Sequence, residues 1–297
     1  MNLVGGRHEE STFQYGGQAV IEGVMMRGKR DLAIAIRRPD ASILVEEERL
    51  RPWGDRLPLL RLPVLRGFII LIETLVIGLK ALNFSASHAA EAEGEEITPL
   101  ELVLTLAVAF SLAILLFIAV PTGAVHLLRE AVPSVLLQNL IEGVLRLGIF
   151  LLYVVAISRM PDIRRFFEYH GAEHKVIHTY EAGSPLTVEE ARQYSVLHPR
   201  CGTSFLLMVM VAAILVFSFL GEGSIWWRIS SRVALLPLVS GIGYEIIKWS
   251  GRHPQGWWRP ILITPGLWLQ RLTTREPDDQ QLEVALSALQ RVLALEA

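Results

Sequence analysis

Four apolar stretches, each about as long as a bilayer is thick, constrain the fold of this chain more than any other feature. Crossing about 30 Å of hydrocarbon takes about 20 helical residues. The stretches cover residues 100–120, 139–158, 203–220 and 229–247. Because 52% of the chain is hydrophobic, a soluble globular class describes it poorly. We therefore expect a mainly α, polytopic membrane protein with about four transmembrane helices.

Basic residues are distributed unevenly between the segments that join these stretches. Lys and Arg number twelve before the first stretch, one in 121–138, six in 159–202, one in 221–228 and six from residue 248 onward. Cytoplasmic segments of membrane proteins carry the excess of Lys and Arg. The alternation predicts a multi-pass protein of the bacterial plasma membrane, with both termini and residues 159–202 in the cytoplasm.

The N-terminal part of the chain has the pattern of a small antiparallel β-meander. The runs GGQAVIEGVMM, LAIAIRR and ASILVEEE are rich in β-forming residues, and turn sequences with Gly, Lys, Asp and Pro separate them. The stretch 64–82 that follows is apolar but contains Arg66, Glu73 and Lys80. Charges at mid-bilayer are costly, so we expect an interfacial or re-entrant helix here. A full crossing would invert the topology of everything before it.

The C-terminal end has the pattern of an amphipathic helix. Asp278 and Asp279 favour a helix start. After them, leucines recur at helical spacing: Leu282, Leu286, Leu289 and Leu293. The chain thus divides into a cytoplasmic β-rich region (1–62), an interfacial helix with linker (63–98), a four-helix transmembrane region with its cytoplasmic loop (99–250), and an interfacial segment with the C-terminal helix (251–297).

The segment HGAEHKVIHTYE concentrates side chains that bind metals. On a helix, its histidines and glutamates fall on one side: His170, Glu173, His174, His178 and Glu181. HGAEH fits H-x-x-E-H, in which two histidines one turn apart share a metal and the Glu polarises a water. His170 and His178 are about two turns apart, roughly 12 Å along the axis, which argues against one ion bound by all three histidines.

A second pair of ligands stands in HPRCGT, just before the third apolar stretch. His198 and Cys201 have a spacing that suits chelation, and both side chains bind Zn²⁺ well. The single cysteine also excludes an intramolecular disulfide. We expect Zn²⁺ on ligands drawn from both segments, namely His170, His174, His198 and Cys201. Glu173 would be the general base. His178 and Glu181 would support these ligands or replace one of them. The alternative is a solvated helix face with a buried cysteine and no metal.

Ionisable residues also occur within the apolar stretches. Glu142 and Arg146 are one turn apart in the second, and Arg232, Glu245 and Lys248 lie at the ends of the fourth. Such groups are costly at membrane depth unless they are paired or hydrated, so they predict an intramembrane polar cluster. Snorkelling of the long side chains at the helix ends is the alternative.

Five sequence motifs, in this order along the chain, resemble those of the YqhQ-like family of bacterial multi-pass membrane proteins. They are GGQAVIEGVMMRG, HGAEHKVIHTYE, HPRCGTSFL, GYEIIK and TPGLWLQRLTTREP. The resemblance extends from about Tyr15 to the C-terminal helix. It implies a membrane location and a metal-dependent enzyme whose site rests on five residues: His170, Glu173, His174, His198 and Cys201.

Together these patterns favour a zinc-dependent enzyme that hydrolyses a membrane-associated substrate at a cytoplasmic site. A non-enzymatic scaffold or biogenesis factor, with a structural metal or none, is the alternative, and a transporter that uses the intramembrane charges is a third hypothesis. The net charge of −2 gives no global attraction for nucleic acid. The expected partners are the lipid bilayer and an unknown membrane-associated substrate or protein, and homo-oligomerisation stays open.

Overall fold

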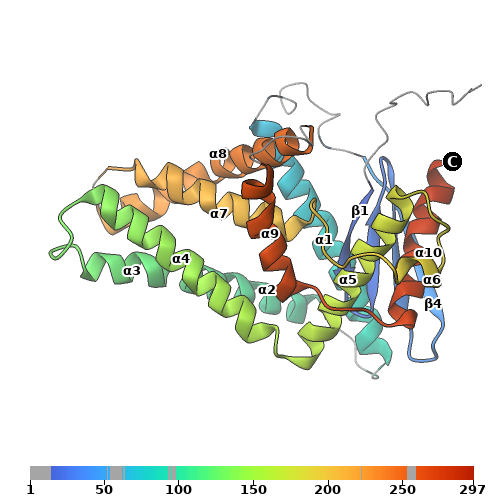
Figure 1. The fold of residues 1–297 in the computed structure, drawn as a ribbon. Helices are drawn as coiled ribbons and strands as arrows, with labels where there is room; N and C mark the ends of the chain where they lie inside the picture. Colours follow the sequence, from blue (N-terminus) through green and yellow to red (C-terminus); the bar gives the residue numbers. More distant parts are fainter. Residues whose placement is uncertain are drawn as a thin grey trace, which may run out of the picture.

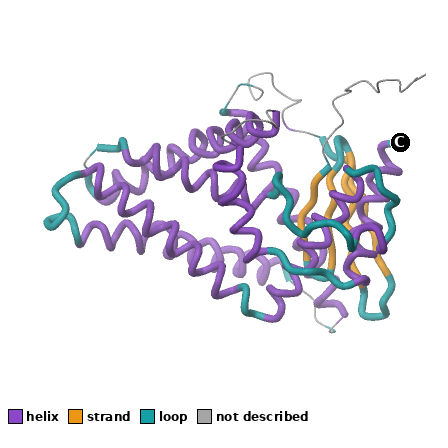
Figure 2. Tube along the Cα trace, in the orientation of Figure 1, coloured by secondary structure: helices purple, strands orange, loops and turns teal. Residues whose placement is uncertain are grey.

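The computed structural model describes residues 15–51, 53, 62, 64–92, 94, 98–221, 223–252 and 259–297. The chain is mainly helical and has one small antiparallel sheet near its N-terminus, as the sequence predicts. Figures 1 and 2 show the sheet at one end of the molecule and a bundle of long helices at the other. The tryptophan-rich start of the expected interfacial segment, residues 253–258, lies outside the described residues.

The sheet is a meander of four strands in the order β1-β2-β3-β4. The strands are β1 (Gly16–Val20), β2 (Gly23–Arg27), β3 (Asp31–Arg37) and β4 (Ile43–Arg49). The predicted meander is therefore confirmed, with one refinement. The run GGQAVIEGVMM forms two strands, because the chain turns at Ile21 and Glu22, where Glu22 has a φ of 53°.

Both faces of the sheet are covered, which explains why β2 and β3 are apolar at nearly every position. Residues on one face, such as Val24 and Ala33, pack against α5 (Pro161–Glu181) and α10 (Asp279–Glu296). Residues on the other face, such as Met25 and Ile34, pack against α1 (Leu65–Ala92). The sheet thus lies between α1 on one side and the His-rich helix α5 with the C-terminal helix α10 on the other.

Helix α10 is the amphipathic C-terminal helix that the leucine spacing predicts. Asp278 and Gln281 form a capping box at its start, which satisfies two backbone N–H groups. Leu282, Leu286 and Leu289 are buried in the core that this helix shares with the sheet and α5. The two ends of the chain therefore build one core, although more than 200 residues separate them.

Within the described residues, two helices are long and apolar enough to cross a membrane. The first, Pro99–Leu127, has 29 residues and comprises α2 (Pro99–Ile114), a π-helical turn (Leu115–Ala119) and α3 (Val120–Leu127). The second is α4 (Val135–Ile157), with 23 residues. Large apolar side chains of α2 are exposed, including Val103, Val108, Phe110 and Leu112. A contiguous apolar surface of this kind is typical of a membrane contact.

The other two expected spans differ in length or composition. Helix α7 (Gly202–Ser218) is apolar but has 17 residues. Helix α8 (Ile225–Arg252) has 28 residues, carries several charges and contains Pro237. Helix α9 (Arg259–Thr273) then crosses close to α7 and leads back to the sheet. By length and composition alone, two of the four expected spans meet the requirement.

Helix α1 joins the helical bundle to the sheet. Its start lies against α8, where a Cβ on Gly67 would be 2.7 Å from Cβ of Tyr244. The three charged residues of its apolar part have partners within the protein: Arg66 donates to Glu245 over 2.7 Å, Glu73 accepts from Arg27 over 2.8 Å, and Lys80 donates to Glu48 over 3.3 Å. These pairs account for the charges in a helix that the sequence marks as otherwise apolar.

Candidate metal centre

Helix α5 carries the metal-binding motif, and its packing fixes which side of the motif is free. Pro161 occupies its first turn and Asp162 adds an acid there, both favourable at a helix start. Tyr169, Ala172 and Val176 are buried in the core shared with the sheet. The histidines project from the neighbouring face, toward the loop that ends at α7.

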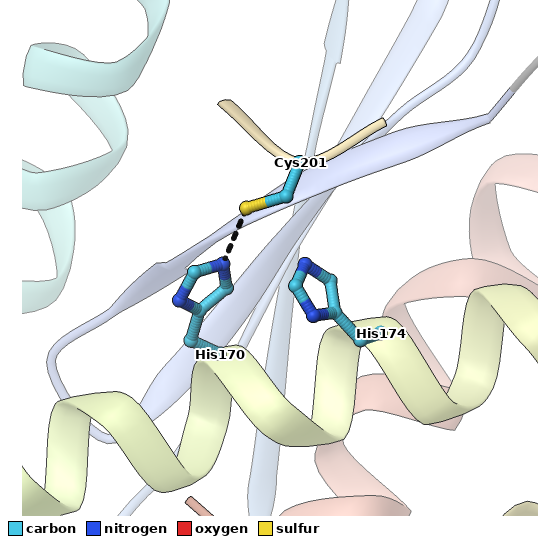
Figure 3. Close-up of side chains that lie close together, drawn as sticks. All are labelled: His170, His174 and Cys201. Atoms are coloured by element: carbon cyan, nitrogen blue, oxygen red, sulfur yellow. Dashed lines mark hydrogen bonds between the residues drawn. The ribbon is translucent and has the colours of Figure 1, made fainter. Parts of the chain in front are cut away.

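Three of the four proposed ligands converge on one point. His170 and His174 lie one turn apart on α5, with ring centroids 4.5 Å apart. Cys201 immediately precedes α7, and its Sγ lies 3.2 Å from Nε2 of His170. Figure 3 shows both rings and the sulfur facing one another. One ligand atom from each of the three residues lies within 4.8 Å of the others, a spacing that a single ion can bridge.

Backbone carbonyls orient both imidazoles of this cluster. Nδ1 of His170 lies 2.8 Å from the carbonyl oxygen of Thr273, and Nδ1 of His174 lies 2.6 Å from that of Val196. A carbonyl only accepts, so each Nδ1 carries the proton and each Nε2 keeps its lone pair. Metal-ligating histidines usually donate the N–H of their other ring nitrogen to a neighbouring acceptor in this way.

The clearest sign of a missing partner is Nε2 of His174. The side chain is 2% exposed, and among the residues that the structure describes, this nitrogen has no hydrogen-bond partner of normal geometry. The Cys201 thiol lies beside it. Burial lowers the pKa of His174, which keeps the ring neutral. A buried lone pair facing a thiol and a second imidazole is what a metal ion would satisfy.

His198 belongs to a second group, with His178 and Glu181. Ligand atoms of these three residues also lie within 4.8 Å of one another. Their hydrogen bonds are satisfied, however: Nδ1 of His198 accepts from the backbone of Arg200 over 3.3 Å, which leaves Nε2 to donate toward Glu181 at 3.5 Å. Glu181 also pairs with Arg200, and Nε2 of His178 lies 3.0 Å from the carbonyl of Leu197. The structure thus separates His198 from the other three proposed ligands.

Glu173 lies beside the first cluster in a largely enclosed position. It is 6% exposed, and its Oε2 lies 3.6 Å from Nε2 of His174. Burial raises the pKa of Glu173, while electrostatic interactions with His170 and His198 and a backbone hydrogen bond from Gly17 act in the opposite direction. These residues line a cavity of about 110 Å³, which has room for several water molecules.

Comparison with known proteins places this architecture in a family. A family model described as "Protein of unknown function (DUF1385)" matches residues 62–295. The chain belongs to this family. A relative, the uncharacterized protein YqhQ of Bacillus subtilis (strain 168), is 39% identical over 298 residues, which cover 95% of this chain and 93% of the relative. No solved structure matches. The resemblance to YqhQ-like proteins is confirmed, and neither description names an activity.

The ligand loop of this chain is held by Gln270, a residue of the motif TPGLWLQRLTTREP to which the sequence analysis assigns no role. The Gln270 side chain, on α9, is fully buried. Its amide accepts from the backbone N–H of His198 over 2.8 Å and donates to the carbonyl of His198 over 2.8 Å and to Ser204 over 2.9 Å. Gln270 therefore fixes the loop between His198 and Cys201. Two signals mark it in the sequence: its place in TPGLWLQRLTTREP and its polar side chain within an apolar helix.

Lys175 is a second motif residue whose role the sequence analysis does not reveal; it stands in HGAEHKVIHTYE. It is buried, and its ammonium donates to the carbonyls of Arg192 and Tyr194 over 2.9 and 2.7 Å. It also pairs with Glu276 at 3.0 Å. Lys175 thereby ties α5 to the loop that carries Val196 and to the segment after α9. In the DUF1385 chain it has a structural role next to the ligands.

The proposed intramembrane polar cluster divides into two parts. Glu142 is buried and pairs with Arg146 at 2.7 Å and with Arg232 at 2.6 Å. Glu245 instead pairs with Arg66, and the ammonium of Lys248 lies 5.6 Å from the centroid of the Tyr244 ring. The structure therefore brings Glu142, Arg146 and Arg232 together and places Glu245 and Lys248 elsewhere.

Proposed function

We propose that this protein is a zinc-dependent membrane enzyme that hydrolyses a membrane-associated substrate at a cytoplasmic site. His170, His174 and Cys201 would hold the ion. The observation that carries the proposal is the buried Nε2 of His174, which has no hydrogen bond of normal geometry among the described residues and lies next to Cys201 and the His170 ring. Oε2 of Glu173 lies 3.6 Å away, beyond hydrogen-bonding distance, so a bound ion would compensate the desolvation of this nitrogen better than the protein does.

The donor set fits zinc and an open coordination position. Two imidazoles and one thiolate are ligands that zinc prefers, and three protein ligands are typical of catalytic sites, whereas structural sites have four. A zinc ion bound there would lower the pKa of a coordinated water to about 7 and so supply hydroxide at neutral pH. The cavity of about 110 Å³ beside the three side chains gives room for that water. This arrangement favours the enzyme over a scaffold with a structural metal.

Glu173 is the group placed to move a proton. Its carboxylate lies in the same cavity, 3.6 Å from Nε2 of His174, and Gly17 holds it from the side of the sheet. Burial raises its pKa toward the working pH, which suits a general base that must later return the proton. Glu173 would accept a proton from water in the cavity and deliver it to the leaving group.

The membrane setting that we propose has four spans, formed by α2 with α3, by α4, by α7 and by α8. The alternation of Lys and Arg along the sequence supports it, as do the exposed apolar side chains of α2. Both termini, the sheet and α5 would then face the cytoplasm. Cys201 caps the start of α7, so the metal centre would lie where that helix enters the bilayer, within reach of a substrate held in the membrane.

Metal analysis of the purified chain tests the ligand set. We expect about one zinc ion per chain, lost in His174→Ala and Cys201→Ser because three ligands leave no redundancy. His198→Asn should retain the ion, since His198 belongs to the hydrogen-bonded group with Glu181. His88→Asn, on α1, is the control for histidine substitution as such. Sub-stoichiometric zinc in the unmutated chain would overturn the proposal.

Cobalt substitution tests catalysis without knowledge of the substrate. A Co²⁺ ion with an open position binds water, so its visible spectrum should change with pH as that water ionises. Glu173→Gln should keep the cobalt bound and shift this titration, while Cys201→Ser should remove the thiolate charge-transfer band. A spectrum that is independent of pH, with stoichiometric metal, would indicate a closed structural site and favour the scaffold.

A further inference from the structure

A second cavity lies at the end of the helical bundle far from the sheet. It has a volume of about 520 Å³ and lies between the connection from α3 to α4 and the start of α8. Figure 1 shows these connections at the left, opposite the sheet and α5. The described residues that line the cavity include two arginines and a histidine and no carboxylate: His126, Arg129, Pro133, Gln138, Gly223 and Arg228.

The wall of this cavity continues into a buried group with excess positive charge. Three arginines surround one carboxylate, that of Glu142: Arg146 at 2.7 Å, Arg232 at 2.6 Å and Arg228 at 3.9 Å. A single carboxylate neutralises one guanidinium, so the group carries a surplus of positive charge away from water. Among the described residues, Arg228 belongs to both the group and the cavity wall.

Arg228 is held at this wall by Gln138 on one side and Glu142 on the other. The side chain is 8% exposed, and its Nη2 donates to Oε1 of Gln138 over 2.7 Å. The Gln138 amide donates in turn to the carbonyl of Val132 over 2.8 Å, which directs its oxygen toward the guanidinium. Nη1 of Arg228 lies 3.9 Å from Oε2 of Glu142 and has no hydrogen bond among the residues that the structure describes. Glu142 is shared with Arg146 and Arg232, so the positive charge of Arg228 is only partly compensated beside the cavity.

The sequence supports this convergence independently. Residues 121–138 and 221–228 contain one basic residue each, Arg129 and Arg228, and both line this cavity. Arg129 is exposed, and its Nη1 lies 3.4 Å from Nε2 of His126. Glu130 is exposed outside the lining, and Glu222 lies outside the described residues. Two segments that otherwise lack basic residues therefore place their cations at one cavity.

We propose that this cavity binds a phosphate group, with Arg228 and Arg129 as its donors. The planar guanidinium presents paired donors that match phosphate oxygens, and a phosphate monoester or diester supplies the negative charge that the arginine group lacks. The volume exceeds that of inorganic phosphate alone and leaves room for an attached group. A lipid headgroup and a soluble phosphate share this chemistry. The site is independent of the metal centre, which lies at the other end of the molecule.

The experiment uses the full chain purified in detergent. Arg129→Gln and Arg228→Gln are the site variants, and Arg164→Gln is the matched control, because Arg164 is an exposed arginine on α5. In the first arm, native mass spectrometry measures the lipid retained from an equimolar mixture of phosphatidylglycerol and a galactosyl diacylglycerol of the same chain length. In the second arm, the melting temperature is measured in lipid-free detergent with added inorganic phosphate.

A preference for phosphatidylglycerol that falls at least about tenfold in Arg129→Gln, and persists in Arg164→Gln, supports a lipid headgroup. Stabilisation by inorganic phosphate in the unmutated chain and the control, absent in Arg129→Gln, supports a soluble phosphate. If Arg129→Gln matches Arg164→Gln in both arms, the proposal is overturned. Arg129 is exposed, so its variant decides the outcome even if Arg228→Gln does not fold.

Discussion

Gly17 and Glu173 are in direct contact across the sheet surface: a Cβ added to Gly17 would lie 2.9 Å from Cγ of Glu173 and 2.5 Å from the carbonyl oxygen of Met25. At this contact, no side chain of β1 separates its backbone from the proposed general base. The neighbouring Gly16 has nothing within 4 Å of such an atom. Of the two glycines that open β1, only the second is required by close packing at the candidate site.

Replacing these two glycines separately tests that contact. Gly17→Ala should lower the free energy of unfolding by about 1–3 kcal/mol, because the added methyl group overlaps a backbone oxygen that cannot move freely. Gly16→Ala should change it by less than about 0.5 kcal/mol, since the methyl group enters open space. Chemical denaturation of the two variants gives both values. Equal stability of the two variants would show that the close packing of Gly17 against Glu173 and Met25 is not required for folding stability.

Glu142 is expected to hold the far end of the helical bundle together. Glu142→Gln leaves Arg146 and Arg232 buried without their carboxylate, which should cost about 3–5 kcal/mol. Glu283→Gln is the matched control, because Glu283 is half exposed in its pair with Arg37 and should cost about 0–1 kcal/mol. Thermal unfolding in detergent compares them. A melting temperature for Glu142→Gln as high as for the control would contradict the role.

The one-sided arrangement of HGAEHKVIHTYE follows from its sequence, because the geometry of a helix is local. His170 and His174 share a face by spacing alone, and the structure keeps them together. The division between His198 and Cys201 is different. Both stand in one four-residue turn, but the turn directs Cys201 toward His170 and His198 toward Glu181. That direction depends on Gln270, 72 residues away, so the spacing of HPRC does not reveal it.

Partners far apart in sequence account for the rest of what sequence reasoning missed. Glu245 pairs with Arg66 across 179 residues, because α1 packs along α8. Apolar periodicity predicts the C-terminal helix and the strands. It does not predict that α10 covers the strands at positions such as Ala33. Helix and strand patterns indicate which face is buried, and the identity of the covering element requires the tertiary fold.

Stability of the metal-free protein should fall with acidification. Burial lowers the pKa of His174, His178 and His198 below their ordinary value of 6.5. The unfolded chain therefore binds more protons below about pH 6.5, and the stability that these rings contribute at neutral pH is lost as the pH falls through their folded pKa values. The raised pKa of Glu173 has the opposite effect, because this group binds its proton more tightly in the folded chain and so adds stability on acidification. It is one group against the three histidines.

Melting temperatures of chelator-treated protein measured between pH 7.5 and 5.5 check this balance. We expect a monotonic fall, and zinc should raise the melting temperature more at pH 7.5 than at pH 5.5 because protons compete for the histidine ligands. His178→Gln should make the fall shallower, since it removes one of the rings without touching the three proposed zinc ligands. A melting temperature that rises on acidification would mean that the effect of Glu173 on stability exceeds that of the three histidines.

Cysteine labelling in intact bacteria checks the proposed four-span topology. Glu130→Cys places a thiol in the connection between α3 and α4, and Glu189→Cys places one in α6 (Val188–Ala191), both at exposed positions. Because the four spans put these positions on opposite sides of the membrane, a membrane-impermeant maleimide should label Glu130→Cys in intact cells and Glu189→Cys only after lysis. The parent chain is the control, since its single cysteine, Cys201, is buried. Labelling of Glu189→Cys in intact cells would reverse the orientation and remove the metal centre from the cytoplasm, and equal labelling of both positions would rule out a span between them.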